Sequence, residues 1–351
     1  MSEVMPYQPT GEELEEVKVV QDLSPYLLDP TVEFSPVEYT LSINGVGFAP
    51  MGDLHVVKAP QKNGKTFLLT ILMGALLRGE YMGISCELEK ARVLFIDTEQ
   101  HPRNTQLVYR RVCMIAGIDG HKRHDNFRVY HMRGAQVEEI RHAILQEVVF
   151  FKPNVVVVDG LVDCVIDPND QAESKGYITA LSGLAMKHNV SMWTVLHTNP
   201  GTDKMRGHLG TILSQKVSDV LMVKKEKQID GSTAFTVSQT DTRNKDLGEF
   251  SFCIEDRKDD SGEWIAMPVA TYVSSDEMQH LDEVMKEALA DGPLRFTDLK
   301  NKVMTNEKVK KTKAIDLIND ARSCGIIAQD SVMRKYSYYG IPAPKNDDMP
   351  F

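Results

Sequence analysis

Between residue 46 and about residue 200, short apolar runs alternate with longer stretches whose apolar positions repeat at helical spacing. The runs read as strands at 54–57, 93–96, 127–131, 155–158 and 192–196, and the stretches read as helices at 64–77, 102–116, 135–150 and 171–188. Runs that are apolar on both faces are typical of parallel strands covered by helices on either side. The pattern predicts an α/β fold built on a doubly wound, mainly parallel sheet.

The segments outside this alternation have other patterns. After a glycine-rich stretch at 202–213 and a short helix at 214–218, strands at 220–224, 234–239 and 250–254 predict a late antiparallel extension of the sheet. Helices at 280–290, 296–303 and 309–323, followed by strands at 326–330 and 335–339, form a winged-helix pattern. We therefore expect an acidic adapter segment at 1–45 with a helix at 12–20, a main domain at 46–273, a small winged-helix-like domain at 278–341 and a Pro-rich, polar tail at 342–351 that cannot fold alone.

The net charge of −10 is unexpected for a protein that binds nucleic acid, but the charges are unevenly distributed. Residues 1–50 hold nine acidic residues and one lysine, a net −8, whereas residues 293–315 hold seven basic and two acidic residues, a net +5. Local patches rather than the total decide whether a protein contacts phosphates. Nucleic acid therefore stays a candidate partner.

Two classes of protein are disfavoured by what the sequence lacks. No apolar run approaches the roughly 20 residues of a membrane helix, and the N-terminus lacks the apolar core of a signal peptide. We expect a cytoplasmic location without membrane contact. The five cysteines form no CxxC pair, which argues against a zinc site.

The strongest chemical signal lies between the first predicted strand and the first predicted helix. It comprises Ala59, Pro60, Gln61, Lys62, Asn63, Gly64, Lys65 and Thr66. In this strand–loop–helix context, backbone N–H groups and the helix N-terminus cradle the phosphates of a nucleotide. We expect Lys65 to reach the β- and γ-phosphates of ATP and the Thr66 hydroxyl to bind Mg²⁺. Ala59 stands where glycine is usual, and a strained turn there would resist alanine; a lysine-rich surface turn is the alternative interpretation.

Two acidic residues follow predicted strands. Asp159 ends the run 155–158, a position suited to holding the water shell of a magnesium ion. Glu99 lies just beyond the run 93–96, where it could deprotonate the attacking water or merely cap a helix. A strand ending in Asp-x-Glu one helix beyond the phosphate loop resembles the RecA-like superfamily of ATPases. The resemblance implies a RecA-like fold and a catalytic base at Glu99.

His197 ends the next strand, within the sequence Leu196-His197-Thr198-Asn199. This position is similar to that of the histidine in plasmid replicative helicases of the RepA type, whose relatives carry glutamine there. The resemblance covers roughly residues 40–265 and implies that His197 senses the γ-phosphate. A purely structural histidine is the alternative.

Two basic segments bear on which RecA-like protein this is. The glycine-rich stretch 202–213 resembles the loop that faces the central channel and touches DNA in RecA-like helicases, so Lys204, Arg206 and His208 are candidate DNA contacts. Arg243 lies in a segment that resembles the one carrying the arginine finger of ring helicases, which completes the site of a neighbouring subunit. A surface loop and a hairpin-turn charge are the respective alternatives.

The ends of the chain suggest further partners. Lys310, Lys311 and Lys313 lie near the start of the third helix of the winged-helix pattern, where they could contact DNA or form a solvated face. The C-terminal residues resemble the acidic tip of bacterial single-stranded-DNA-binding proteins, which docks replication and repair proteins. The residues concerned are Asp347, Asp348, Met349, Pro350 and Phe351.

These patterns lead to one expectation and two alternatives. We expect a helicase-like DNA motor that depends on ATP and Mg²⁺. It would form a homo-oligomer, for which a hexamer is the expected form, and would hold single-stranded DNA in its channel. A RecA-like regulator or recombination mediator would switch with ATP without translocating. A small-molecule kinase would need an acceptor site, and no segment of the sequence reads as one.

Overall fold

The computed structural model describes residues 27–227, 233–243, 245–270, 275–323, 326–330 and 333–340. The chain divides into two units, one up to Val37 and one from Glu38 onward. The described part of the first unit, residues 27–37, contains no helix or strand. The predicted helix at 12–20 and the predicted tail at 342–351 lie outside the described residues.

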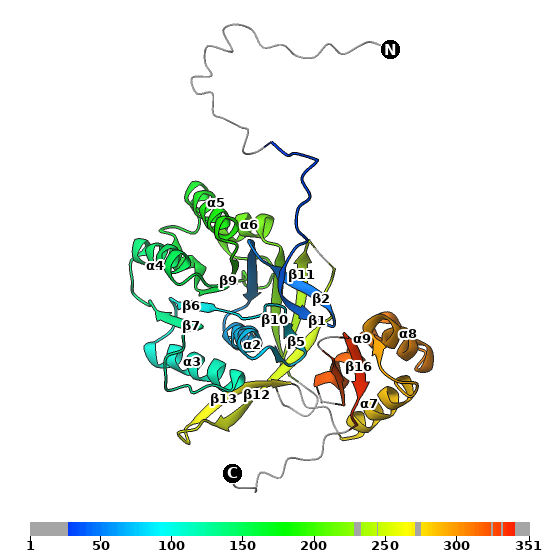
Figure 1. Cartoon of the computed structure of the whole chain (residues 1–351). Coiled ribbons are helices and arrows are strands. Elements are labelled where there is room, and N and C mark those ends of the chain that lie inside the picture. Colours follow the sequence, from blue (N-terminus) through cyan, green and yellow to red (C-terminus); the bar gives the residue numbers. More distant parts are fainter. Residues whose placement is uncertain are drawn as a thin grey trace, which may run out of the picture. The chain divides into compact units, whose positions relative to one another are not determined.

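A large sheet forms the centre of the second unit (Figure 1). Within the described residues it has nine strands in the order β13-β12-β11-β10-β3-β9-β8-β6-β7. Their bounds are β3 Leu54–Ala59, β6 Val93–Asp97, β7 Phe127–His131, β8 Val155–Asp159, β9 Ser191–His197, β10 Asp219–Lys227, β11 Thr233–Thr242, β12 Phe250–Lys258 and β13 Trp264–Ala270. All pairs from β10 to β7 are parallel, and the pairs from β10 to β13 are antiparallel. The predicted parallel sheet with a late antiparallel extension is therefore confirmed.

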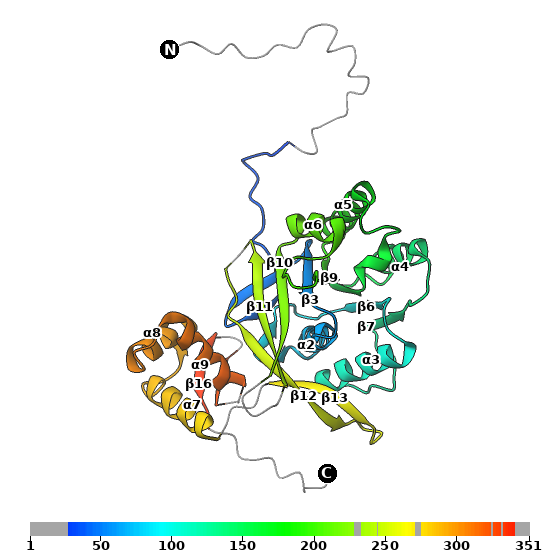
Figure 2. The ribbon, with the colours of Figure 1, turned by 180° about the vertical axis from the view of Figure 1, so that it is seen from behind.

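Helices cover both faces of the parallel strands, as Figures 1 and 2 show. Helices α2 (Lys65–Arg78) and α3 (Pro102–Ala116) pack on one face, and α4 (Val137–Phe150), α5 (Gln171–His188) and α6 (Gly207–Lys216) pack on the other. In β8, Val155 and Val157 belong to the first core while Val156 and Val158 belong to the second. Side chains of a strand alternate between faces, so burial on both sides requires the continuous apolar run that the sequence contains.

Helix α6 corrects one prediction. The sequence predicted a loop over 202–213 and a helix at 214–218, whereas α6 spans Gly207–Lys216. Its two glycines obscured the helical pattern, because glycine is a poor helix former. Gly210 is required there: a Cβ at this position would lie 2.6 Å from the Cβ of Met205.

Four short strands, two before β3 in the chain and two after α2, form a small antiparallel sheet. It has the order β2-β1-β5-β4, with bounds β1 Tyr39–Ile43, β2 Val46–Pro50, β4 Glu80–Tyr81 and β5 Ile84–Cys86. Leu41, Phe48 and Ile84 bury their side chains in the α2 face of the main core. These strands are not predicted from the sequence because they are short and partly polar.

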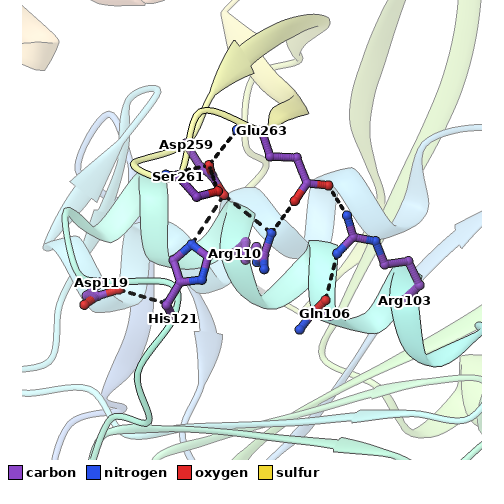
Figure 3. Close-up of polar contacts among 8 residues, drawn as sticks. All are labelled: Arg103, Gln106, Arg110, Asp119, His121, Asp259, Ser261 and Glu263. Carbon is purple, nitrogen blue, oxygen red and sulfur yellow. Dashed lines mark hydrogen bonds and ion pairs between the residues drawn. The ribbon is translucent and has the colours of Figure 1, made fainter.

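The hairpin of β12 and β13 is fastened to α3 by ion pairs (Figure 3). The carboxylate of Glu263 bridges the guanidinium groups of Arg103 and Arg110, and Asp259 lies 3.5 Å from Arg110 and 3.6 Å from His121. Apolar side chains of β13, among them Ile265 and Met267, pack beneath this network against α3. The hairpin is thus held on both its polar and apolar sides.

The outer strand of this hairpin, β13, ends the sheet. Two of its carbonyl oxygens accept hydrogen bonds from side chains: that of Ala266 from Arg111 Nε at 2.7 Å and that of Pro268 from the Tyr81 hydroxyl at 2.7 Å. Pro268 has no backbone N–H to offer. Side chains and a proline therefore occupy positions where a further strand would otherwise pair.

The C-terminal part has its own apolar core, formed by three helices and a small antiparallel sheet. The elements are α7 Ser275–Ala288, α8 Phe296–Asn306, α9 Lys311–Ser323, β14 Leu294–Arg295, β15 Ile327–Gln329 and β16 Lys335–Tyr338. Predicted helices and strands match these elements within a few residues, apart from the missed β14. No helix among the described residues has the length and apolar character needed to cross a membrane.

Candidate functional site

The phosphate loop connects β3 to α2. Ala59 is the last residue of β3 and Lys65 the first residue of α2, with Gly64 as N-cap. The left-handed backbone conformations of the loop fall at Lys62 (φ 60°) and Gly64 (φ 80°). Ala59 therefore sits in extended strand, where a Cβ is tolerated, and the strain expected at this position is not present.

Contacts from the antiparallel strands hold the loop in shape. Asn63 Oδ1 accepts a hydrogen bond from the backbone N–H of Lys225 at 3.2 Å, and Asn63 Nδ2 donates to the carbonyl of Gln61 at 3.0 Å. A Cβ on Gly64 would lie 2.6 Å from the ring of Phe235, which stacks on Phe252. Glycine is thus required at 64 both by backbone conformation and by this close packing.

Lys65, His197 and Glu99 form a chain of polar contacts. The ammonium of Lys65 lies 3.0 Å from His197 Nδ1 and donates to the carbonyl of Pro60 at 3.4 Å. His197 Nε2 lies 3.6 Å from Glu99 Oε1. Because the ammonium can only donate, Nδ1 is the acceptor and Nε2 carries the proton that faces Glu99. His197 therefore links the phosphate-binding lysine to the candidate base.

The surroundings shift the pKa of both residues at the ends of this series of contacts, Glu99 and Lys65. The hydrogen bond from His197 lowers the pKa of Glu99, although burial acts in the opposite direction. Glu99 is therefore ionised at neutral pH. Burial lowers the pKa of Lys65, and the carboxylates of Asp159 and Glu99 counteract that effect. These carboxylates favour the ammonium form of Lys65 in a site where only 6% of the residue is exposed.

Thr66 and Asp159, the two residues predicted to hold the metal, are in contact. The Thr66 hydroxyl donates to Asp159 Oδ2 at 3.0 Å. Burial, together with repulsion from Glu99 and Asp97, raises the pKa of Asp159 to about 7. The buried carboxylate thus lacks sufficient positive charge around it.

The donor set suits a magnesium ion. If Asp97, Glu99 and Asp159 are all ionised, three negative charges face the single positive charge of Lys65, and a divalent cation would balance the remainder. Hydroxyl and carboxylate oxygens are the hard ligands that Mg²⁺ prefers. Thr66 would bind the ion directly and Asp159 through its water shell. Among the described residues no group of three His, Cys, Asp or Glu side chains forms a complete metal cage, so phosphates and water must supply the other ligands.

Two residues beside Glu99, Asp97 and Thr98, have no role predicted from the sequence. Asp97, at the end of β6, is fully buried and pairs in register with Asp159 of β8. The Thr98 hydroxyl lies within 3.1 Å of the carbonyls of Asp159 and Gly160 and 2.7 Å from the Asp163 carboxylate. The sequence did hold a signal for Asp97. An aspartate at the end of a strand can accept a hydrogen bond from the backbone N–H two residues later, which here is that of Glu99.

The candidate DNA-binding loop begins directly at His197. Thr198 and Met205 pair as an isolated bridge, and the N–H of Arg206 donates to the carbonyl of His197 at 3.0 Å. Lys204 and Arg206 are exposed on this loop. His208 is also exposed but lies in α6 rather than in a loop. The loop is therefore attached by a backbone hydrogen bond to the residue that contacts Lys65.

Arg243 lies away from its own phosphate loop. It follows β11, whose Thr242 pairs with Asp219 and hence lies beside His55 at the beginning of β3, whereas the phosphate loop follows the end of β3. The exposed guanidinium is 3.4 Å and 3.5 Å from the last carbonyls of α6. Arg243 is thus not part of the site that its own chain assembles.

The remaining candidates lie in the C-terminal part. Lys310, Lys311 and Lys313 are all exposed around the N-terminus of α9. Further along α9, Arg322 donates to the Ser85 hydroxyl of β5 at 3.1 Å, and Asn319 accepts from Asn44. The predicted partner-binding residues, Asp347, Asp348, Met349, Pro350 and Phe351, lie outside the described residues.

Comparison with known proteins supports the assignment made from geometry. The model of a family described as an AAA domain (AAA_25) matches residues 34–203. The matched range contains the phosphate loop, Glu99, Asp159 and His197. A search of curated proteins found no match. The family match, with a mainly parallel sheet consistent with a RecA-like fold, indicates a P-loop NTPase.

Proposed function

We propose that the chain is a DNA-dependent, ATP-hydrolysing motor, a helicase-like protein of DNA replication or mobilisation. The observation that carries this proposal is the position of His197. Its ring lies between Lys65 and Glu99, and its carbonyl accepts from Arg206 at the base of an exposed basic loop. A change at the terminal phosphate therefore has a short hydrogen-bonded route through His197 to a candidate DNA contact.

Each residue of the site has a distinct part in hydrolysis. Lys65 binds the β- and γ-phosphates, a role that requires its ammonium to exchange His197 for phosphate oxygen. Thr66 and Asp159 hold Mg²⁺, which screens phosphate charge when bound. Glu99, ionised by virtue of its lowered pKa, accepts the proton of the attacking water. His197 reports whether the γ-phosphate is present by contacting either Lys65 or the nucleotide.

The proposal includes DNA and a second copy of the chain. Lys204 and Arg206 contact the backbone of single-stranded DNA, with His208 beside them, and Lys310, Lys311 and Lys313 form a second phosphate-binding patch in a winged-helix-like domain. Arg243 acts on a neighbouring subunit of a homo-oligomer, a hexamer in the simplest arrangement. That role requires its guanidinium to leave the carbonyls of α6. The acidic tip ending in Phe351 recruits replication or repair proteins.

A second candidate function is an ATP-switched regulator or recombination mediator that does not translocate. The net charge of −10 favours it, because a protein so acidic repels DNA outside its local basic patches. Such a regulator hydrolyses ATP slowly and separates no strands.

Steady-state ATP hydrolysis with and without single-stranded DNA tests the proposal. We expect stimulation of about tenfold or more, abolished by Lys65→Ala and Glu99→Gln. Lys204→Ala combined with Arg206→Ala should remove the stimulation while leaving the basal rate unchanged. Stimulation would justify a strand-unwinding assay. A measurable rate indifferent to DNA would refute the motor and leave the regulator.

A further inference from the structure

Asp97 is a buried carboxyl group without an ion-pair partner among the described residues. Its exposed fraction is 0%, and within the described parts of the chain no Lys, Arg or His lies within ion-pair distance of its carboxylate. Burying an ionised carboxylate is costly unless several donors surround it. Its position therefore calls for an explanation beyond strand geometry.

Three of the four donors around Asp97 come from the turn that carries Glu99, and the fourth comes from α3. Oδ1 accepts from the backbone N–H groups of Glu99 at 3.1 Å and Gln100 at 3.0 Å. Oδ2 accepts from Gln100 Nε2 at 3.0 Å and from the Thr105 hydroxyl at 2.7 Å. One carboxylate thus fixes the backbone of the candidate base and ties the same turn to α3.

We propose that Asp97 is the positioning residue of the catalytic centre, fixing the backbone at Glu99 so that its carboxylate meets the attacking water. The proposal rests on the proposed hydrolytic function. Glu99 follows the strand by only two residues, and its carboxylate lies 3.6 Å from Nε2 of His197. Its direction therefore depends on the backbone of the turn, which Asp97 holds at two successive N–H groups.

Thr98 makes the second half of the same clamp. Its N–H donates to the Asp159 carbonyl at 3.1 Å and its hydroxyl contacts Asp163. Asp97 and Thr98 thus fix the turn on opposite sides, one toward α3 and one toward β8. Misplacing a catalytic group by about 1 Å costs on the order of 10²-fold in rate, which sets the scale of the expected effect.

Asp97→Ala tests the proposal directly, with Asp97→Asn as its conservative counterpart. Alanine removes the acceptor from both N–H groups, and we expect kcat to fall about 10- to 100-fold with nucleotide affinity within about threefold. Asparagine keeps one oxygen for the N–H groups and should recover most of kcat. Thr105→Val removes one donor isosterically and should lower kcat by a few-fold.

Thr40→Val is the matched control, because the Thr40 hydroxyl is equally buried and donates to the Ala49 carbonyl at 2.9 Å in the small sheet. It should lose stability as Thr105→Val does but keep its kcat. Hydrogen exchange of the peptide covering 98–101 gives a second readout, independent of activity. Exchange should rise in Asp97→Ala, remain near the wild-type rate in Asp97→Asn and be unaffected in Thr40→Val.

The outcomes separate the two proposals. An active wild type whose Asp97→Ala variant keeps its kcat overturns the role of Asp97 alone, as does a loss of kcat that Thr40→Val reproduces. Unchanged exchange at 98–101 also overturns it, because the carboxylate then does not hold the turn. A folded wild type that does not hydrolyse ATP refutes the proposed function and with it any positioning role.

Discussion

Gly160→Ala is a severe test of the packing beside the turn that carries Glu99. Gly160 follows Asp159 with φ 108° and ψ 51°, a conformation that side chains other than glycine rarely adopt. A Cβ there would lie 2.0 Å from the Thr98 hydroxyl and 2.9 Å from Glu99 Cγ. Backbone strain contributes about 1–3 kcal/mol and overpacking about 1–3 kcal/mol. We expect the free energy of unfolding to fall by about 2–6 kcal/mol.

Urea unfolding followed by far-ultraviolet circular dichroism measures this loss, with Gly176→Ala as the control. Gly176 lies inside α5 with open space around its position, so alanine there should raise the free energy of unfolding by about 0.5–1 kcal/mol. The two identical substitutions therefore have opposite predicted signs. A Gly160→Ala variant within about 0.5 kcal/mol of the wild type would refute the reasoning. Glu99 should also be displaced, so the surviving folded protein should hydrolyse ATP poorly.

Three further predictions concern separate features. Thr66→Ala should raise the dissociation constant of MgATP at least about tenfold but change that of metal-free ADP little, which calorimetry would show; equal losses would exclude Thr66 as a metal ligand. His197→Ala should lower kcat about tenfold or more while nucleotide affinity stays within a few-fold, with His142→Ala, an exposed histidine of α4, as the control; an unchanged kcat would leave His197 a structural residue. Burial raises the pKa of Asp219, but hydrogen bonds from His55, the Ala49 N–H and Thr242 outweigh it and lower the pKa overall. The unfolded state then binds more protons than the native state. The wild type should therefore exceed Asp219→Asn in free energy of unfolding by a constant amount above about pH 5, and by less as acid protonates the native carboxylate. A difference that grows in acid would show that the pKa of Asp219 is raised rather than lowered.

The parallel core could be predicted because its pattern is strong. Runs such as 155–158 are apolar on both faces, and α3 and α5 were predicted with their observed bounds, Pro102–Ala116 and Gln171–His188. Pro102 at the start of α3 and Asn189 at the C-cap of α5 mark those ends chemically. Long elements with capping signals are thus readable from sequence alone.

Elements without such signals were missed. The strand β13 contains a proline, and the strands β4 and β14 have two residues each, so none shows a recognisable period. The start of α6 was placed seven residues too late because two glycines hide its pattern. These elements form because tertiary contacts, such as Ile265 against α3, outweigh weak local preferences.

The candidate site was predictable in its residues but not in its contacts. Strand-end logic indicated that Lys65, Glu99, Asp159 and His197 lie together, and the structure brings all four to one edge of the sheet. The sequence pattern could not indicate that His197 lies between Lys65 and Glu99, because that arrangement depends on side-chain rotamers and on the register of β3 with β9. Asp97 was read as part of a motif without a role, since its four donors become evident only when the turn is folded.

The termination of the sheet at β13 affects the tendency of the protein to aggregate at high concentration. A bare outer strand offers a template on which a second chain can add, and such growth leads to aggregation or fibrils. Here the Tyr81 hydroxyl and the Arg111 guanidinium occupy two carbonyls, and Pro268 withholds a donor. A Tyr81→Phe and Arg111→Ala double variant would free both carbonyls without touching the phosphate site. The same side chains that attach the hairpin to the ATPase core therefore also oppose polymerisation through the β13 edge of the sheet.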